Sequence, residues 1–337
     1  MGDSESFGFI ERSVPRAGER EGSFPSRFWD LGACRKTHAL LHGIRVLVCI
    51  ATWASCGSPL AVSRDSGEPA GGGDANTGTN GFVQISAGYE QICGLRVDGT
   101  VVCSGATESG QSTPPPGSFA QISAGFRFVC GVHRDGSAAC WGNGILGAAP
   151  PAASTLTQVA SGDLFACGLL KDGSITCWGS NYLGATTAPA GTFTQVSADL
   201  YHACGLRTDG SVACWGQNTS GESSPPAGTF TQVVAGWNHA CGLRADGTAA
   251  CWGADEVGQC DPPAGTFIQI TASIANTCGL RANGTIVCWG VDPETEMPMT
   301  SPTGTFLQIS LGEKVFCGLH SDGSTVTCWG ITLTLGP

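Results

Sequence analysis

Residues 204–216 read CGLRTDGSVACWG, and this stretch decides the fold because variants of it recur seven times along the chain. The phenylalanine or leucine that opens each repeat lies at position 82, 119, 156, 193, 230, 267 or 306, which gives five intervals of 37 residues and a last one of 39. A fixed period of this length is typical of solenoids, propellers and other repeat architectures. We therefore divide the chain into repeats before interpreting any other pattern.

Each copy of the quoted stretch predicts a β-hairpin. The loop Thr208-Asp209-Gly210 separates two short strands and places a glycine where a bulged three-residue hairpin needs positive φ. Counting outward from this loop, Cys204 faces Cys214 at a non-hydrogen-bonded position of the ladder. Directly opposite Cβ atoms lie within disulfide range at such a position.

We predict one disulfide within each repeat. The predicted pairs are Cys93–Cys103, Cys130–Cys140, Cys167–Cys177, Cys204–Cys214, Cys241–Cys251, Cys278–Cys288 and Cys317–Cys328. Buried free thiols are one alternative, since cysteine packs well as a small apolar residue. Zinc ligation is another, but the pairs lack the short ligand spacing and no histidine cluster accompanies them. Seven disulfides would point to an oxidising compartment.

The complete repeat predicts an all-β, seven-bladed β-propeller built from seven repeats of about 37 residues. A strand such as residues 193–198 precedes the hairpin, and a Pro-Pro-Ala-Gly-Thr crossover as at 225–229 follows it. Three strands, with room for a short fourth, cannot bury both faces alone, whereas seven such units in a ring can. A linear solenoid is the alternative, although neither end has a polar capping repeat. Residues 331–335 alternate like a strand and are candidates to close the ring as the outer strand of the last blade.

The segments before the repeats predict export. Residues 1–34 are polar and are predicted to be disordered, or to reflect a start codon chosen too far upstream. Residues 35–56 combine a basic region, a short apolar run and small residues before Cys56, which is typical of a signal peptide of the lipoprotein type. Plain secretion and an uncleaved anchor are the alternatives, because Trp53 departs from the lipoprotein pattern. Residues 57–80 predict a flexible linker, and residues 81–337 the propeller.

The repeat resembles the regulator-of-chromosome-condensation repeat in its short, cysteine-containing bacterial form. The resemblance is carried by F-x-Q-V-S-A-G, then H-x-C-G-L-R-x-D-G-[ST]-V-x-C-W-G, then N-x-x-G, and it covers residues 82–337. The first repeat departs by having Ser104 in place of tryptophan, and Asp199 and Ser273 replace the glycine that follows the first strand. The resemblance implies guanine-nucleotide exchange on a small GTPase, as in eukaryotic relatives. It also implies β-lactamase inhibition through an aromatic rim, as in a bacterial propeller of similar short repeats.

Charge and motifs exclude several classes of function. The net charge of −11 disfavours binding to nucleic acid and to anionic membrane surfaces, so we expect membrane contact only through a lipid anchor or signal segment. His202 and His239 share a repeat position with unrelated residues, which favours a structural role over a metal site. The chain has no nucleophile elbow, phosphate loop or metal motif. We therefore predict no enzyme activity, no cofactor and no metal, and we interpret Cys260 as a chance free thiol.

The informative positions vary between repeats while their neighbours do not. They form the turn between the first strand and the hairpin, and all such turns are expected at one rim of the ring. Aromatic residues at a central patch are favoured anchors of protein interfaces. The predicted rim-binding residues are Tyr89, Phe126, Arg127, Leu164, Tyr201, Trp237 and Asn238. The alternative is that some of them pack between blades.

The sequence thus predicts an exported, lipid-tethered, non-catalytic propeller that binds a protein or glycan through one rim. The expected location is the periplasm, the outer membrane or the extracellular medium, and the expected state is a monomer. Besides the two functions that the resemblance implies, a purely structural protein of the cell envelope is an alternative.

Overall fold

The computed structural model describes residues 81–143, 150, 155–292, 295, 297–330 and 333–335. The predicted start (1–34), signal segment (35–56) with Cys56, and linker (57–80) lie outside the described residues. Within the described ranges, no helix has the length and apolar character needed to cross a membrane.

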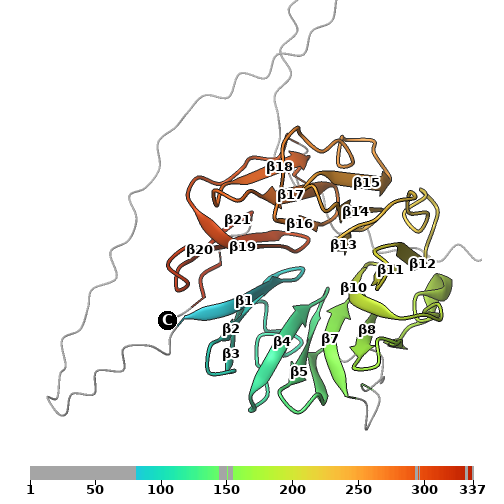
Figure 1. The fold of residues 1–337 in the computed structure, drawn as a ribbon. Coiled ribbons are helices and arrows are strands. Elements are labelled where there is room, and N and C mark those ends of the chain that lie inside the picture. The colour runs from blue at the N-terminus through green and yellow to red at the C-terminus, as the bar shows by residue number, and fades with distance from the viewer. Residues whose placement is uncertain are drawn as a thin grey trace, which may run out of the picture. The chain divides into compact units, whose positions relative to one another are not determined.

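Seven antiparallel sheets of three strands each form the blades of a propeller (Figure 1). The innermost strands, one per blade, are β1 (Phe82–Ala87), β4 (Phe119–Ala124), β7 (Leu156–Ser161), β10 (Phe193–Asp199), β13 (Gln232–Ala235), β16 (Gln269–Ala272) and β19 (Phe306–Leu311). The middle strands are β2 (Gln91–Arg96), β5 (Phe128–His133), β8 (Phe165–Leu170), β11 (His202–Arg207), β14 (His239–Leu243), β17 (Asn276–Leu280) and β20 (Val315–His320). The outer strands are β3 (Val101–Gly105), β6 (Ala138–Gly142), β9 (Ile175–Gly179), β12 (Val212–Gly216), β15 (Ala249–Gly253), β18 (Ile286–Gly290) and β21 (Val326–Gly330). A short 3-10 turn, η1 (Tyr182–Gly184), follows β9. The predicted propeller is confirmed.

The hairpins have the predicted register. In blade four, Leu206 pairs with Val212 and Cys204 with Cys214, and Gly210 in the loop has φ of 83°. The structure joins the seven predicted cysteine pairs as disulfides, with Cα–Cα distances of 4.0–4.1 Å. The longer seventh loop keeps the same pairing of Cys317 with Cys328. Seven cysteine pairs at bonding distance indicate an oxidising environment.

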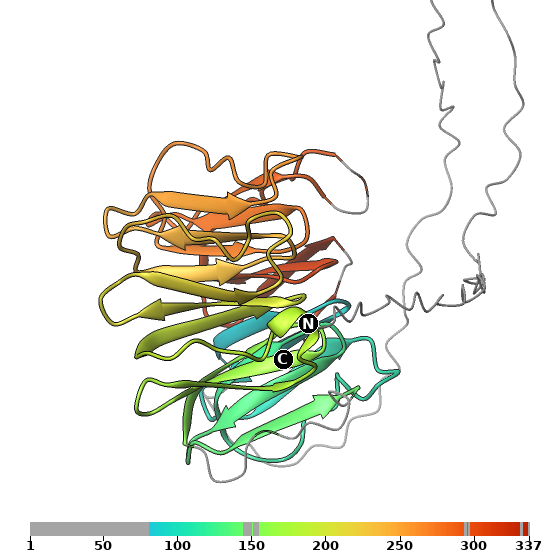
Figure 2. The ribbon, with the colours of Figure 1, turned by 90° about the vertical axis from the view of Figure 1, so that its right-hand side faces the viewer.

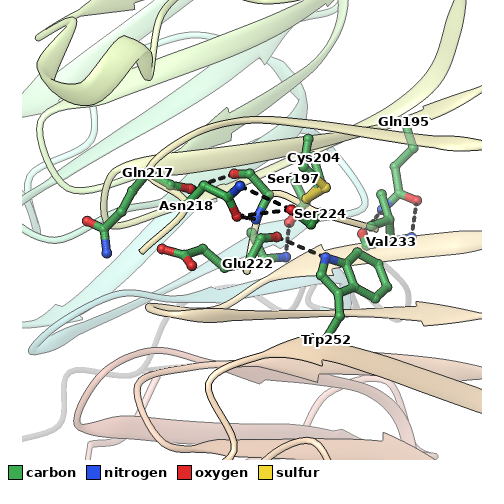
Figure 3. Close-up of a disulfide and its surroundings, with 12 residues drawn as sticks. Gln195, Ser197, Cys204, Gln217, Asn218, Glu222, Ser224, Val233 and Trp252 are labelled. Atoms are coloured by element: carbon green, nitrogen blue, oxygen red, sulfur yellow. Dashed lines mark hydrogen bonds between the residues drawn. A yellow bond between two sulfur atoms is a disulfide. The ribbon is translucent and has the colours of Figure 1, made fainter. Parts of the chain in front are cut away.

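The blades pack against one another through seven apolar clusters, each shared by two neighbouring blades. The cluster between blades four and five, for example, joins Cys204 and Leu206 of β11 to Phe230 and Trp252 of the next repeat. The tryptophan indole N–H also donates to the carbonyl of Glu222 in the preceding crossover, at 2.9 Å (Figure 3). In the view of Figure 2, neighbouring blades lie one above another.

A ladder of glutamines joins the innermost strands. Gln195 of β10 donates its amide N–H to the carbonyl of Val233 in β13 and accepts the backbone N–H of the same residue, both at 2.9 Å (Figure 3). The glutamine in each of the other six innermost strands makes the same two bonds to the next blade. Each amide thereby satisfies an N–H and a C=O on the axis-facing edge of the next innermost strand, which is otherwise unpaired.

The ring closes between blades seven and one. Gln308 of β19 bonds to both backbone groups of Ile85 in β1, so the ladder is continuous. The interface has no tryptophan from blade one, because that position is Ser104, and Leu333 and Leu335 pack into this cluster instead. These leucines belong to the segment for which a strand was expected. Residues 333–335 form no strand, so this part of the prediction is wrong, and the segment contributes apolar contacts instead.

Candidate functional site

A cavity of about 160 Å³ opens where the innermost strands end and their following turns begin. In five repeats the strand is followed by a glycine, and in four of these the glycine lies against the backbone of the next blade, so the turns crowd closely around the axis. A Cβ at Gly125, for example, would lie 2.4 Å from the carbonyl oxygen of Gly162. The residue after this glycine varies between repeats and determines the chemistry of the cavity mouth.

Two of the predicted rim aromatics, Tyr89 and Phe126, line this cavity and contact each other. Their ring centroids lie 4.4 Å apart, and both side chains are partly exposed. The guanidinium of the exposed Arg127 lies 5.2 Å above the Phe126 ring, and the ammonium of Lys314 lies 4.8 Å from the Tyr89 ring. Lys314 also pairs with Glu90 at 3.2 Å. Blades seven, one and two thus share one aromatic and charged surface.

The other predicted rim residues lie further around the ring. Tyr201 contacts Tyr182 of η1, with ring centroids 4.9 Å apart, and Tyr182 is an exposed aromatic that the sequence reasoning missed. Trp237 is partly exposed and turns its indole toward Glu313. The backbone carbonyls of Leu164 and Asn238 accept bonds from residues just after β9 and β15, which places these two residues toward the outer strands. None of the seven is fully buried, and whether they bind a partner stays a prediction.

Three carboxyl groups that the sequence reasoning did not select also meet at the cavity mouth. Asp199 and Glu313 line the cavity, and Asp163 is close enough to influence both of them electrostatically. Asp199 replaces the usual glycine, β10 extends to Asp199, and the next residue, Leu200, takes φ of 32°. The departure from glycine at position 199 was visible in the sequence, but its neighbours were not.

Burial and mutual repulsion perturb these carboxyl groups. Burial raises the pKa of Glu313 to about 8, and the Asp199 and Asp163 carboxylates add to the rise, against the lowering effect of the Trp237 indole and Lys314. Burial likewise raises the pKa of Asp199 to about 7, and the neighbouring Asp163 carboxylate adds to this, although the Leu200 N–H lowers it. Burial also raises the pKa of Asp163, against the Tyr201 hydroxyl and the Arg127 charge. Perturbed carboxyl groups in a cavity mark a candidate functional site.

The repeat histidines are core residues. His202 and His239 are fully buried, and burial lowers the pKa of His202 to about 4 and that of His239 to about 3. His239 bonds to the hydroxyl of Thr277 in the next blade at 2.9 Å, as expected of a polar side chain that joins repeats, whereas His202 makes no side-chain hydrogen bond within the described chain. In the part of the chain that the structure describes, no group of three or more His, Cys, Asp or Glu residues is arranged to hold a metal ion.

Cys260 occupies a loop position that serine fills in other repeats. Its thiol lies 3.2 Å from the carbonyl oxygen of Ala254, six residues earlier, and the hydroxyls of Ser112 and Ser223 donate to the equivalent carbonyls. Burial raises the pKa of the Cys260 thiol to about 12, and nearby Asp255, Asp261 and Glu256 add to this rise. These contacts favour a structural role over a redox role.

We expect Cys260 to react slowly with thiol reagents in the folded protein. A pKa near 12 instead of 9 lowers the thiolate fraction at pH 8 by roughly 10³-fold, and the thiolate is the reactive species. The measurement is the difference in labelling between the chain and its Cys260→Ser variant, without reductant. In guanidinium chloride the unsubstituted chain should show one more reactive thiol than the variant. Rapid labelling of Cys260 in the native protein would contradict this prediction.

The comparisons with known proteins agree with the repeat and the fold. The family model described as Regulator of chromosome condensation (RCC1) repeat matches residues 156–185, 193–222 and 230–259. No curated protein sequence matches the chain.

Several solved structures have the same propeller. The ectodomain of the Physcomitrella patens receptor kinase CR4 is 27% identical, with 74% of each chain covered and a TM-score of 0.64. The CRINKLY WD40 ectodomain of the Arabidopsis thaliana receptor kinase ACR4 is 25% identical, with 77% of this chain and 98% of that chain covered and a TM-score of 0.63. Prp20p from Saccharomyces cerevisiae, studied with its binding to Gsp1p and histones, is 13% identical over 72% of this chain and 84% of its own, with a TM-score of 0.61. The protein is therefore a seven-bladed β-propeller that contains repeats of the regulator of chromosome condensation (RCC1) type.

Proposed function

We propose that the protein is an exported, non-catalytic binding module that contacts a protein partner through the turns around its central cavity. The observation that carries this proposal is the aromatic surface at the cavity mouth, where Tyr89 and Phe126 are partly exposed and in contact. Aromatic side chains on a rigid scaffold supply large contact areas at a low entropic cost, and they are enriched among the residues that dominate binding energy.

Two further features support a binding role outside the cytoplasm. The seven disulfides fit an oxidising compartment such as the periplasm, the outer membrane surface or the extracellular medium. The similarity to two receptor-kinase ectodomains supports a location outside the cytoplasm, and we propose a protein partner in preference to a glycan. Tethering through a lipid on Cys56 is part of this proposal, as is a monomeric state. The same aromatic surface would serve inhibition of a secreted enzyme, which is one form of protein binding.

The test is affinity capture from an envelope extract with the full chain, beside a variant with Tyr89, Phe126, Tyr201 and Trp237 changed to alanine. We expect the unchanged chain to retain a partner and the variant to bind this partner at least ~100-fold more weakly, because a few buried aromatic anchors dominate most interfaces. Circular dichroism and unchanged disulfide content would verify that the variant is folded.

A matched control changes apolar side chains elsewhere on the surface. Val83, Ile268 and Leu307 are more than half exposed and lie near the other end of the innermost strands, in blades one, six and seven. Their replacement by alanine should leave capture unchanged. Loss of capture with this control and not with the aromatic variant would move the binding site to the opposite rim, and equal capture by all three proteins would contradict the proposal.

A further inference from the structure

The mouth of the central cavity holds more acidic than basic groups, so it becomes negatively charged as its carboxyl groups lose their protons. Asp199 and Glu313 line the cavity, and Asp163 lies close enough to repel both. Glu313 is 7% exposed, and among the described residues it takes part in no ion pair. An ionised carboxyl group that is nine-tenths buried is costly unless a cation or several hydrogen bonds compensate for it.

The cations near the cavity have other partners. Lys314 pairs with Glu90 at 3.2 Å and lies against the Tyr89 ring, so much of its charge is already compensated. Arg127 is exposed above Phe126 and acts on Asp163. Around the mouth, the charged and titratable groups are Tyr89 and Glu90 of blade one, Arg127 of blade two, Asp163 of blade three, Asp199 and Tyr201 of blade four, and Glu313 and Lys314 of blade seven. With every group ionised except the tyrosines, these sum to a net charge of −2.

Aromatic rings border the same carboxyl groups. The Trp237 indole N–H turns toward Glu313, yet this nitrogen is buried without a well-aligned acceptor among the described residues. Tyr201 lies beside Asp163 and influences its pKa. Tryptophan and tyrosine faces attract ammonium and guanidinium groups, and this attraction adds to that of the carboxylates.

The size of the cavity limits what enters it. At about 160 Å³ it is smaller than the roughly 300–1,000 Å³ of pockets that hold drug-sized ligands. It is large enough for the end of one side chain. Since no described group of three acidic or imidazole side chains is arranged to hold a metal ion, an organic cation fits this arrangement better than a metal.

We propose that the cavity mouth binds one ammonium or guanidinium group, supplied by a lysine or arginine side chain that the protein partner inserts between Glu313, Asp199 and Trp237. This inference rests on the proposed function, because it names the group of the partner that the aromatic surface surrounds. The aromatic residues then provide contact area, and the carboxylates select a partner with a protruding cationic side chain.

The test uses a short peptide with a central lysine, acetyl-Gly-Lys-Gly-amide, and its norleucine analogue, which lacks the charge. Binding to the full chain is measured by NMR line broadening of the peptide. We expect the lysine peptide to bind at least ~10-fold more tightly than the norleucine peptide. The double variant Asp199→Asn/Glu313→Gln should lose this preference, whereas Glu108→Gln, which changes an exposed carboxyl group in a loop, should keep it.

The pH dependence separates ion pairing from a merely structural role. The affinity for the lysine peptide should rise between pH 6 and pH 9, because the carboxyl groups lose their protons in this range while the lysine stays charged. The norleucine peptide should show no such rise. Equal binding of the two peptides, or an unchanged preference in the double variant, would overturn the proposal.

The two proposals can fail separately. If the aromatic variant loses the captured partner while Asp199→Asn/Glu313→Gln retains it with full affinity, the binding module stands and the cationic side chain does not. If the double variant abolishes binding of the lysine peptide but no partner is captured, the cation site stands and the proposed function does not.

Discussion

Replacing Glu313 by glutamine is expected to stabilise the protein at pH 9 and to leave its stability at pH 4 nearly unchanged. The carboxyl group has a pKa of about 8 in the folded chain, against an ordinary value of 4.5. Between these pH values the unfolded chain has released its proton and the folded chain still holds it, so raising the pH favours unfolding by about 1.4 kcal/mol per pH unit. Glutamine mimics the protonated side chain and removes this loss.

The expected gain from Glu313→Gln at pH 9 is several kcal/mol, at most ~5 kcal/mol, in the free energy of unfolding. Denaturant unfolding without reductant, at pH values from 4 to 9, measures it. The exposed control Glu108→Gln should reproduce the unsubstituted profile. A Glu313→Gln variant whose stability follows the pH in the same way as the unsubstituted chain would show that Glu313 does not cause the loss of stability at high pH. A stabilising substitution at a buried carboxyl group is the expected signature of a residue retained for function.

Replacing Gln308 by leucine is expected to destabilise the ring by about 2–6 kcal/mol. The amide accepts the N–H of Ile85 at 2.8 Å and donates to its carbonyl at 3.3 Å, and Ile85 is buried. Leucine has a similar volume but leaves both backbone groups without a partner. A buried unsatisfied group costs about 1–3 kcal/mol, and two groups are affected.

Denaturant unfolding of Gln308→Leu at neutral pH measures this loss, again with the disulfides intact. Gln217→Leu is the matched control, because the side-chain amide of Gln217 bonds only to side chains of the surface loops, at Thr219 and Asn238, and its loss should cost less than ~1 kcal/mol. Equal stabilities of the two variants would contradict the view that the glutamine ladder closes the ring.

Local patterns were sufficient to predict the blade. The hairpin at Thr208-Asp209-Gly210 depends only on its own loop residues, and the loop fixes the register that brings Cys204 opposite Cys214. The number of repeats then implied the number of blades, because each sheet must bury both faces against neighbours. The strand prediction failed for residues 333–335, because alternation alone cannot distinguish a strand from a segment whose leucines pack where the other interfaces have a tryptophan.

The candidate site was only partly accessible from the sequence. The variable turns were identified because their residues change between repeats, and Tyr89 and Phe126 do line the cavity. Asp163, Asp199 and Glu313 were not selected, because they come from blades three, four and seven and occupy two different repeat positions. The pKa of a carboxyl group depends on its burial and on nearby charges, and the closing of the ring decides which charges are nearby.

The sequence by itself therefore determined the repeat, the hairpin register, the cysteine pairs and the propeller, since each follows from interactions within about 37 residues. Only the tertiary structure decided how the ring closes and which residues line its cavity. Closure depends on Gln308 reaching Ile85 from the far end of the chain, and the charge of the cavity depends on carboxyl groups that packing brings together. Both are long-range contacts, and a periodic sequence specifies neighbours one repeat apart but not the residues that meet across the axis.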